Sequence, residues 1–196
     1  MGKVKSALEI ALEKAGKIGE LSEEEKERIK DEGKVTSILS EFYHGNLDSE
    51  GIWQRLKGSK PSLLRKTQVN LIDSLSLSTS KEDTQQRKRG ILAIETLKDK
   101  PNTAVIESAL REIEELQKDY EEVKKQVVED LKRQIEMHPQ LQMQPVRTPD
   151  GKTVMQMSVS VDEAVKARLG DLLEEHEKQY NQQFSEVIEE LKDEVK

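Results

Sequence analysis

The sequence predicts a mainly α-helical protein, with a helical N-terminal region followed by a long antiparallel helical hairpin tipped by a β-hairpin. In the C-terminal half, apolar residues recur at helical spacing along two stretches of about 35 residues each. Between these stretches, apolar and polar residues alternate, which is typical of strands. Hydrophobic residues make up only 34% of the chain and charged residues 36%. This composition favours thin, elongated helical packing.

The N-terminal region begins with two predicted helices. An apolar stripe indicates a helix over 3–18, with side chains at Val4, Leu8, Ala11, Ala15 and Ile18. Ser22 followed by Glu25 is the pattern of a capping box, which predicts the start of the next helix. Gly33 is a candidate interruption of that helix, whose expected buried stripe is Ile29, Val35, Ile38, Leu39 and Phe42.

Three further helices are expected before residue 103. A short one follows Asp48, and another starts with Pro61 at its first position. Ser80, paired with Asp83, caps a third helix that runs to about Leu97. A break at Lys100-Pro101-Asn102-Thr103 divides the chain into an N-terminal region, 1–103, and a helix–β-hairpin–helix domain, 104–196. The apolar residues expected to be buried by these helices are Ile52, Trp53, Leu56, Leu64, Leu71, Ile72 and Leu75.

The C-terminal half holds the two long stripes. The first reads Ile106, Leu110, Ile113, Leu116, Tyr120, Val123, Val127, Leu131 and Ile135. The second reads Val165, Leu169, Leu172, His176, Tyr180, Phe184, Val187, Leu191 and Val195. The spacing repeats at eleven residues, which predicts coiled-coil-like packing that is straight or slightly right-handed. At helical rise, each helix would be about 52 Å long.

A β-hairpin is expected between the two helices. Thr148-Pro149-Asp150-Gly151 predicts a turn, because proline presets φ and glycine adopts the left-handed conformation that follows. This turn pairs Val146 with Val154 and Met143 with Met157, so that the residue numbers of each pair sum to 300. The helices follow the same mirrored order, which places Tyr120 opposite Tyr180, Leu131 opposite Leu169 and Leu116 opposite Phe184.

The apolar face of the β-hairpin is the predicted interaction surface. An isolated two-stranded hairpin is marginal in water, so this face needs a cover. Another protomer, the N-terminal helices or a client protein could supply it, and we expect a homo-oligomer. The residues of this face are Leu141, Met143, Met155, Met157 and Val159.

Catalytic and cofactor motifs are missing from the sequence. The chain has no cysteine, no glycine-rich phosphate loop and no Gly-x-Ser-x-Gly motif. Glu41-x-x-His44 has the spacing of half a carboxylate di-metal site, but the second half is not in the sequence. We therefore expect no enzyme activity, no cofactor and no metal. Without an apolar run long enough for a membrane span or a signal peptide, a cytoplasmic location is expected.

The segment 51–72 is basic and contains no acidic residue until Asp73. It is a candidate phosphate-binding or nucleic-acid-binding segment, with Arg87-Lys88-Arg89 as a later basic run. The interpretation we favour is that these cations balance the acidic C-terminal half, within or between protomers. A nucleic-acid partner is therefore the less favoured interpretation. The candidate phosphate-binding residues are Arg55, Lys57, Lys60, Arg65 and Lys66.

The order helix, β-hairpin, helix over 104–195 resembles one subunit of prefoldin, an oligomeric holdase chaperone. The resemblance implies assembly through the β-hairpin and a surface that holds unfolded clients. Residues Lys5 to Lys14 also look like the opening of small bacterial helical proteins of unknown function. The favoured function is a non-enzymatic scaffold or interaction protein that self-associates through the β-hairpin and helix stripes. A prefoldin-like holdase and a nucleic-acid-associated protein are the alternatives.

Overall fold

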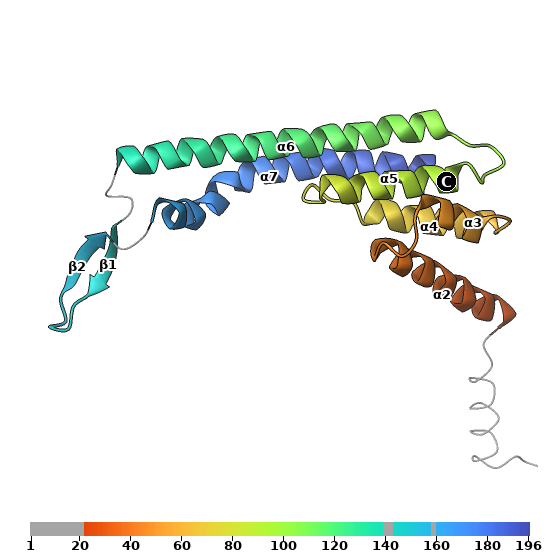
Figure 1. The fold of residues 1–196 in the computed structure, drawn as a ribbon, viewed down its shortest axis with the longest axis horizontal. Coiled ribbons are helices and arrows are strands. Elements are labelled where there is room, and N and C mark those ends of the chain that lie inside the picture. Colours follow the sequence, from red (N-terminus) through yellow and green to blue (C-terminus); the bar gives the residue numbers. More distant parts are fainter. Residues whose placement is uncertain (1–21, 139–142, 158–159) are drawn as a thin grey trace, which may run out of the picture.

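The computed structural model of the chain describes residues 22–138, 143–157 and 160–196. The mainly α-helical class is confirmed (Figure 1). The helix expected over 3–18 lies outside the described residues. In chain order the described elements are α2 (Glu23–Tyr43), α3 (Ser49–Leu56), α4 (Pro61–Asp73), α5 (Lys81–Glu95), α6 (Thr103–Met137), β1 (Met143–Arg147), β2 (Thr153–Met157) and α7 (Val161–Glu194).

Helix α2 begins at the expected capping box. Ser22 accepts a hydrogen bond from the Glu25 backbone N–H, and Glu25 accepts one from the Ser22 N–H. The helix passes through Gly33 without a break, so the candidate interruption was wrong. The expectation that Ile29 is buried was also wrong, because its side chain is 52% exposed. The buried part of α2 starts only at Val35.

The starts of α3, α4 and α5 confirm three local predictions. The Asp48 side chain accepts a hydrogen bond from the Gly51 N–H at the start of α3. Pro61 takes the first position of α4, where its missing N–H leaves no hydrogen bond unmade. The Ser80 side chain accepts from the Asp83 N–H and caps α5.

The main core joins α2–α5 to the adjoining ends of α6 and α7, and we call this part of the molecule the bundle. Its side chains come from both sides of Thr103, from Val35 in α2 to Val195 at the end of α7. Gly90 of α5 lies at the closest packing point, where an added Cβ would be 3.0 Å from Phe42 Cζ and 3.2 Å from Leu71 Cδ1. Glycine therefore lets α5 approach α2 and α4 closely.

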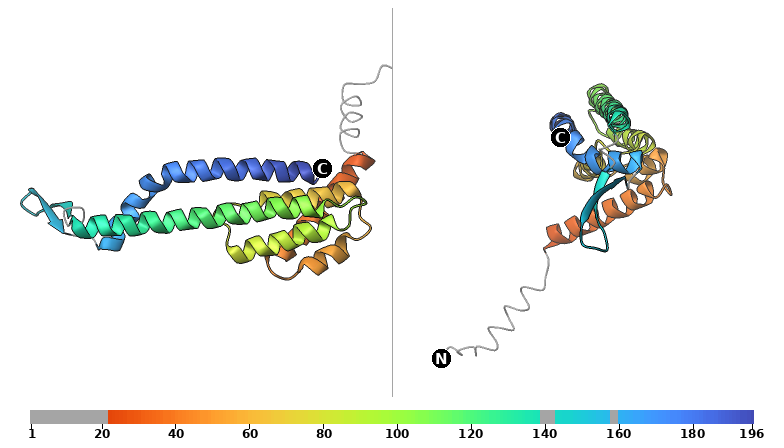
Figure 2. Two further views of the ribbon diagram at one scale, coloured as in Figure 1. Left: turned by 90° about the horizontal axis from the view of Figure 1, so that it is seen from above. Right: turned by 90° about the vertical axis from the view of Figure 1, so that its left-hand side faces the viewer.

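Helices α6 and α7 run antiparallel side by side (Figure 2). The rings of Tyr120 and Tyr180 pack with their centroids 5.5 Å apart, as the mirrored order predicted. Leu172, however, is 49% exposed and its neighbour Leu173 is buried. Leu173 precedes Phe184 by eleven residues, which is about three helical turns and the same face of the helix. The stripe therefore runs through Leu173, and the assignment of Leu172 to it was wrong.

Beyond the tyrosine pair the two helices leave the bundle and form what we call the arm, residues 121–137 and 161–179. A second, smaller core holds the arm together near its far end. It contains the buried residues Leu131, Ile135, Ala164 and Val165. Asp162 at the start of α7 also pairs with Lys132 of α6 at 2.8 Å. The arm is thus only two helices thick, and Met137 at its end is 70% exposed.

The strands β1 and β2 pair antiparallel with Met143 opposite Met157 and Val146 opposite Val154, the register that the turn predicted. Gly151 has φ of 82°, and its N–H donates to the Thr148 carbonyl. The Thr148 N–H donates in turn to the Lys152 carbonyl at 2.8 Å. The hairpin extends from the end of the arm, and among the described elements no helix runs alongside it (Figures 1 and 2).

Candidate functional site

The basic segment 51–72 is largely neutralised by α2. Arg55 makes two hydrogen bonds of 2.6 Å to the two carboxylate oxygens of Glu41. Lys60 binds Glu27 at 2.8 Å and Lys66 binds Glu32 at 2.7 Å. Within one chain, the expectation that cations balance the acidic C-terminal half was therefore wrong for Arg55, Lys60 and Lys66. All three carboxylates belong to one helix of the N-terminal region, and the pairs fasten α2 to α3 and α4.

The carboxylates of these ion pairs are in the charged form that fastening α2 to α3 and α4 requires. Hydrogen bonds from Lys60, Lys66 and Arg55 lower the pKa values of Glu27, Glu32 and Glu41, respectively. The carboxylates therefore remain charged and keep their cations at neutral pH.

Two candidate cations are left outside these pairs. The ammonium of Lys57 lies 4.9 Å from the centroid of the Trp53 ring, a cation–π contact. Arg65 is exposed. With three of the five candidates already paired, the segment offers a phosphate chain little uncompensated charge.

The later basic run, Arg87-Lys88-Arg89, is divided among different surroundings. The Arg87 guanidinium lies 5.6 Å from the centroid of the Tyr43 ring. Lys88 pairs with Glu114 of α6 at 3.1 Å, and Arg89 is exposed beside a groove. Arg87 and Lys88 therefore contact different neighbours, and the three side chains do not converge on one point, as an anion site would require.

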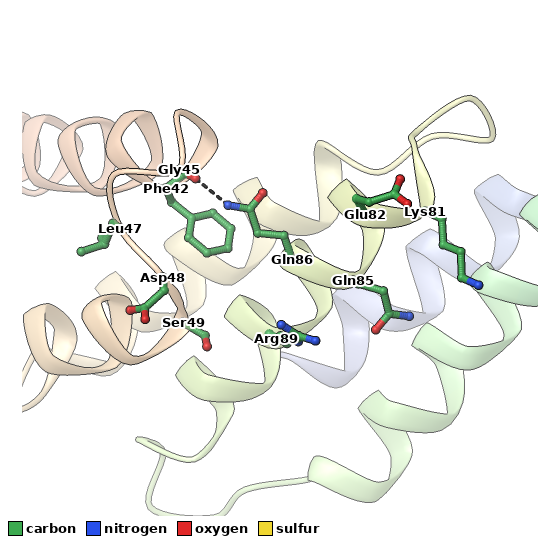
Figure 3. Close-up of a pocket in the computed structure, with 10 residues that line it drawn as sticks. All are labelled: Phe42, Gly45, Leu47, Asp48, Ser49, Lys81, Glu82, Gln85, Gln86 and Arg89. Carbon is green, nitrogen blue, oxygen red and sulfur yellow. Dashed lines mark hydrogen bonds between the residues drawn. The ribbon is translucent and has the colours of Figure 1, made fainter.

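That groove, of about 500 Å³, lies between the α2–α3 turn and α5 (Figure 3). Gln86 crosses it and donates a hydrogen bond of 2.7 Å to the Phe42 carbonyl. Asp48 is occupied in capping α3. The remaining ionic groups on its walls, Lys81, Glu82 and Arg89, lie apart in Figure 3 and form no acid–base pair.

A second cavity, of about 580 Å³, lies where the arm leaves the bundle. The 76–80 loop, the start of α5 and the middle of α6 form its walls. Thr84 donates to Gln117 at 3.1 Å, and Gln117 donates to the Ser76 carbonyl at 2.7 Å. These buried polar groups satisfy one another, so they brace the loop against α6 and do not point to a ligand.

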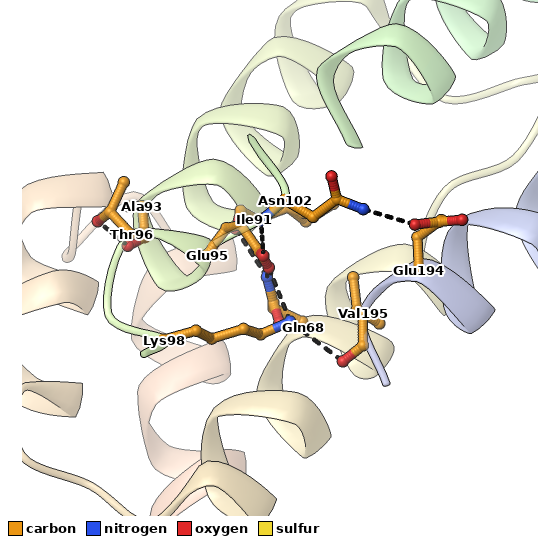
Figure 4. Close-up of polar contacts among 9 residues, drawn as sticks. All are labelled: Gln68, Ile91, Ala93, Glu95, Thr96, Lys98, Asn102, Glu194 and Val195. Atoms are coloured by element: carbon orange, nitrogen blue, oxygen red, sulfur yellow. Dashed lines mark hydrogen bonds and ion pairs between the residues drawn. The ribbon is translucent and has the colours of Figure 1, made fainter. Parts of the chain in front are cut away.

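Within the bundle, a polar network joins α4 and α5 to the end of α7 (Figure 4). Glu95 is 1% exposed and accepts hydrogen bonds from Gln68 at 2.8 Å and from the Asn102 N–H at 2.8 Å. Lys98 pairs with Glu95 at 2.7 Å and donates to the Val195 carbonyl at 3.1 Å. The Asn102 side chain binds Glu194 at 2.6 Å. The network therefore ties α4, α5 and the start of α6 to the C-terminal end of α7.

Two opposing effects set the pKa of Glu95. Burial raises it, but the hydrogen bonds from Asn102, Gln68 and Lys98 together outweigh burial and leave the pKa below its ordinary value. The carboxylate is therefore ionised at neutral pH and part of the structure of the bundle. Sequence reasoning did not single out Glu95, although its position four residues after Ile91 places it on the buried face of α5.

The described residues form neither a metal cluster nor a membrane-spanning helix. Within residues 22–138, 143–157 and 160–196, no group of three or more candidate metal ligands converges. Glu41 is held by Arg55, and His44 Nδ1 lies 2.6 Å from the Ser40 carbonyl, so both members of the Glu-x-x-His pair have other partners. No helix in the described part of the chain is long and apolar enough to cross a bilayer.

The predicted interaction residues are placed only in part. Leu141 and Val159 lie outside the described residues. Met143 lies in β1, and Met155 and Met157 lie in β2, where the structure describes their backbone. Within the hairpin, the main chain of the two strands defines the edges that this surface presents.

Residues 52–193 match the family of unknown function DUF6657. The chain belongs to this family. No curated protein and no solved structure matches it, so the resemblance to prefoldin gains no support from these comparisons. The matched range of this DUF6657 protein includes most of α3, all of α4–α6 and the β-hairpin, and α7 except its last residue, whereas α2 and its carboxylates lie outside it.

Proposed function

We propose that this DUF6657 protein is a non-enzymatic interaction protein that associates with further copies of itself through the β-hairpin at the end of the arm. The observation that carries the proposal is the position of the hairpin, because no described helix runs alongside its strands (Figure 1). A two-stranded sheet alone is marginally stable in water. Its unpaired strand edges are also ready sites for another strand.

The arm gives the proposal its second support. Each helix of the arm buries one stripe, and the small core of Leu131, Ile135, Ala164 and Val165 leaves Met137, at the hairpin end of α6, 70% exposed. This side chain lies where a second copy that meets the hairpin could cover it. The bundle, by contrast, has a continuous core and internally paired charges, so we assign it the role of a stable base for the arm.

The nucleic-acid alternative is disfavoured by the ion pairs of Arg55, Lys60 and Lys66 with α2. No described contact favours the holdase alternative over self-association. We therefore keep self-association as the proposed function.

The test is the mass of the purified chain by light scattering at micromolar concentration. We expect a mass above the 22.4 kDa of one chain. Replacing residues 143–157 with a Gly-Ser segment of equal length should return the mass to that of a monomer while leaving the helical circular dichroism signal in place. Lys152→Ala, at the exposed tip of the hairpin, is the matched control and should keep the oligomer. A monomeric wild type would refute the proposal.

A further inference from the structure

The two outer edges of the β-hairpin differ in their main-chain hydrogen-bonding groups. The register pairs residues 143–147 with 153–157 without a bulge. The Thr148 N–H bonds the Lys152 carbonyl, which fixes the phase of the ladder. Because bonded and non-bonded pairs alternate in an antiparallel ladder, the pairs at Val146 and Gln144 are bonded within the hairpin. The main-chain groups of the residues between them point outward.

The outer edge of β1 is blocked. Its outward residues are Met143, Pro145 and Arg147, and Pro145 lies at the centre without an N–H to donate. Proline and a nearby charged residue are the features by which natural sheets protect an edge strand from further pairing. A third strand cannot therefore form a complete ladder along β1.

The outer edge of β2 is open. Its outward residues are Thr153, Met155 and Met157, and each has both an N–H and a carbonyl. The strand Thr153-Val-Met-Gln-Met157 contains no charged residue and no proline. It therefore lacks the protection that β1 has, on a strand with an apolar composition suited to pairing.

A second copy of the same strand fits this edge. When β2 pairs antiparallel with β2 of another copy about a two-fold axis at Met155, Thr153 of each copy lies opposite Met157 of the other. All three outward residues then find partners. Shifting the axis to Val154 or Gln156 leaves one outward residue of each strand without an opposite strand residue, so the register centred on Met155 makes the most bonds. Such a symmetric contact closes on itself and forms a pair.

We propose that two copies join through the outer edges of their β2 strands, with the two-fold axis at Met155, to form a four-stranded sheet in the order β1-β2-β2-β1. This inference rests on the proposed self-association and specifies its contact. Both ends of the new sheet are the proline-protected β1 edges, which limits the assembly to two copies. The four strands also exceed the minimum of three that an independent sheet needs.

The test uses backbone amide hydrogen exchange of the full chain, resolved by residue with NMR, together with the mass in solution. In the dimer, the N–H groups of Thr153, Met155 and Met157 should exchange more than about tenfold more slowly than those of Met143 and Arg147. The β1 amides are the internal control, because they point outward on the blocked edge. Diluting the protein should remove the protection of β2 alone.

The matched substitution is Met155→Pro, which removes the central outward N–H of β2. The residue paired with Met155 within the hairpin, Pro145 of β1, is already a proline. We expect a monomer with unchanged helical signal, whereas Met155→Leu should remain a dimer. A Met155→Pro protein that stays oligomeric, or equal exchange on both edges of an oligomeric wild type, overturns the β2 contact but leaves self-association standing. A wild type that is monomeric overturns both.

Discussion

Replacing Glu95 by alanine is expected to lower the free energy of unfolding by about 3 kcal/mol, because it leaves buried donors without their acceptor. The Gln68 amide, the Asn102 N–H and the Lys98 ammonium all point at this carboxylate. The loss should appear in chemical denaturation followed by circular dichroism. Glu115→Ala, on the exposed surface of α6, is the control and should change the value by less than about 0.5 kcal/mol.

The Glu95 carboxylate also makes the free energy of unfolding fall as the pH is lowered. The folded state holds the pKa of Glu95 below the ordinary value of 4.5. Its contribution is therefore present in full above that value and is lost as the pH falls through the lowered folded-state pKa. The Glu95→Ala protein should lack this part of the acid-induced loss. If the two proteins lose stability in parallel on acidification, the assigned role of Glu95 is wrong.

Gly90→Val is the second substitution with a large expected effect, a loss of about 3 kcal/mol from overpacking. An added Cβ already meets Phe42 and Leu71 at 3.0 and 3.2 Å, and the valine methyl groups would extend further into these side chains. Both neighbours are fully buried, so they have little room to move. A thermal melt should show a fall of roughly 6–12 °C for a chain of this size.

Gly33→Ala is the control for that substitution. Gly33 is also inside a helix, but an added Cβ there would meet nothing within 4 Å. Alanine should therefore stabilise the protein by up to about 1 kcal/mol, through helix propensity alone. If both substitutions changed the free energy of unfolding by the same amount, close helix packing would not be the reason for glycine at position 90.

Local signals in the sequence predicted much of the fold. The caps at Ser22, Asp48 and Ser80 and the turn at Gly151 each depend on a few adjacent residues, and each is in place. The contact of Tyr120 with Tyr180 followed from two stripes read in mirrored order. These features are predictable because the residues that cause them lie close together or repeat with a regular period.

Contacts between distant parts of the chain could not be predicted from local signals in the same way. The helical stripe allows both Leu172 and Leu173, and only the packing partner decides which is buried. The cations at 51–72 could pair with any acidic helix, and the arrangement of α2 beside α3 and α4 selects Glu27, Glu32 and Glu41. Glu95 reads as an ordinary surface acid until Gln68, Lys98 and Asn102 are brought around it by the fold.

Self-association through the hairpin brings copies of this protein together at the end of the arm, with their bundles far apart. Spin labels attached to single introduced cysteines test it directly, since the chain has no cysteine of its own. A label at Met137, near the hairpin, should give a short intermolecular distance. A label at Lys100, at the opposite end of α6, should give a separation of roughly 100 Å or more, because two helices of this length lie between the labels. A short distance at Lys100, or no intermolecular signal at Met137, would contradict the claim.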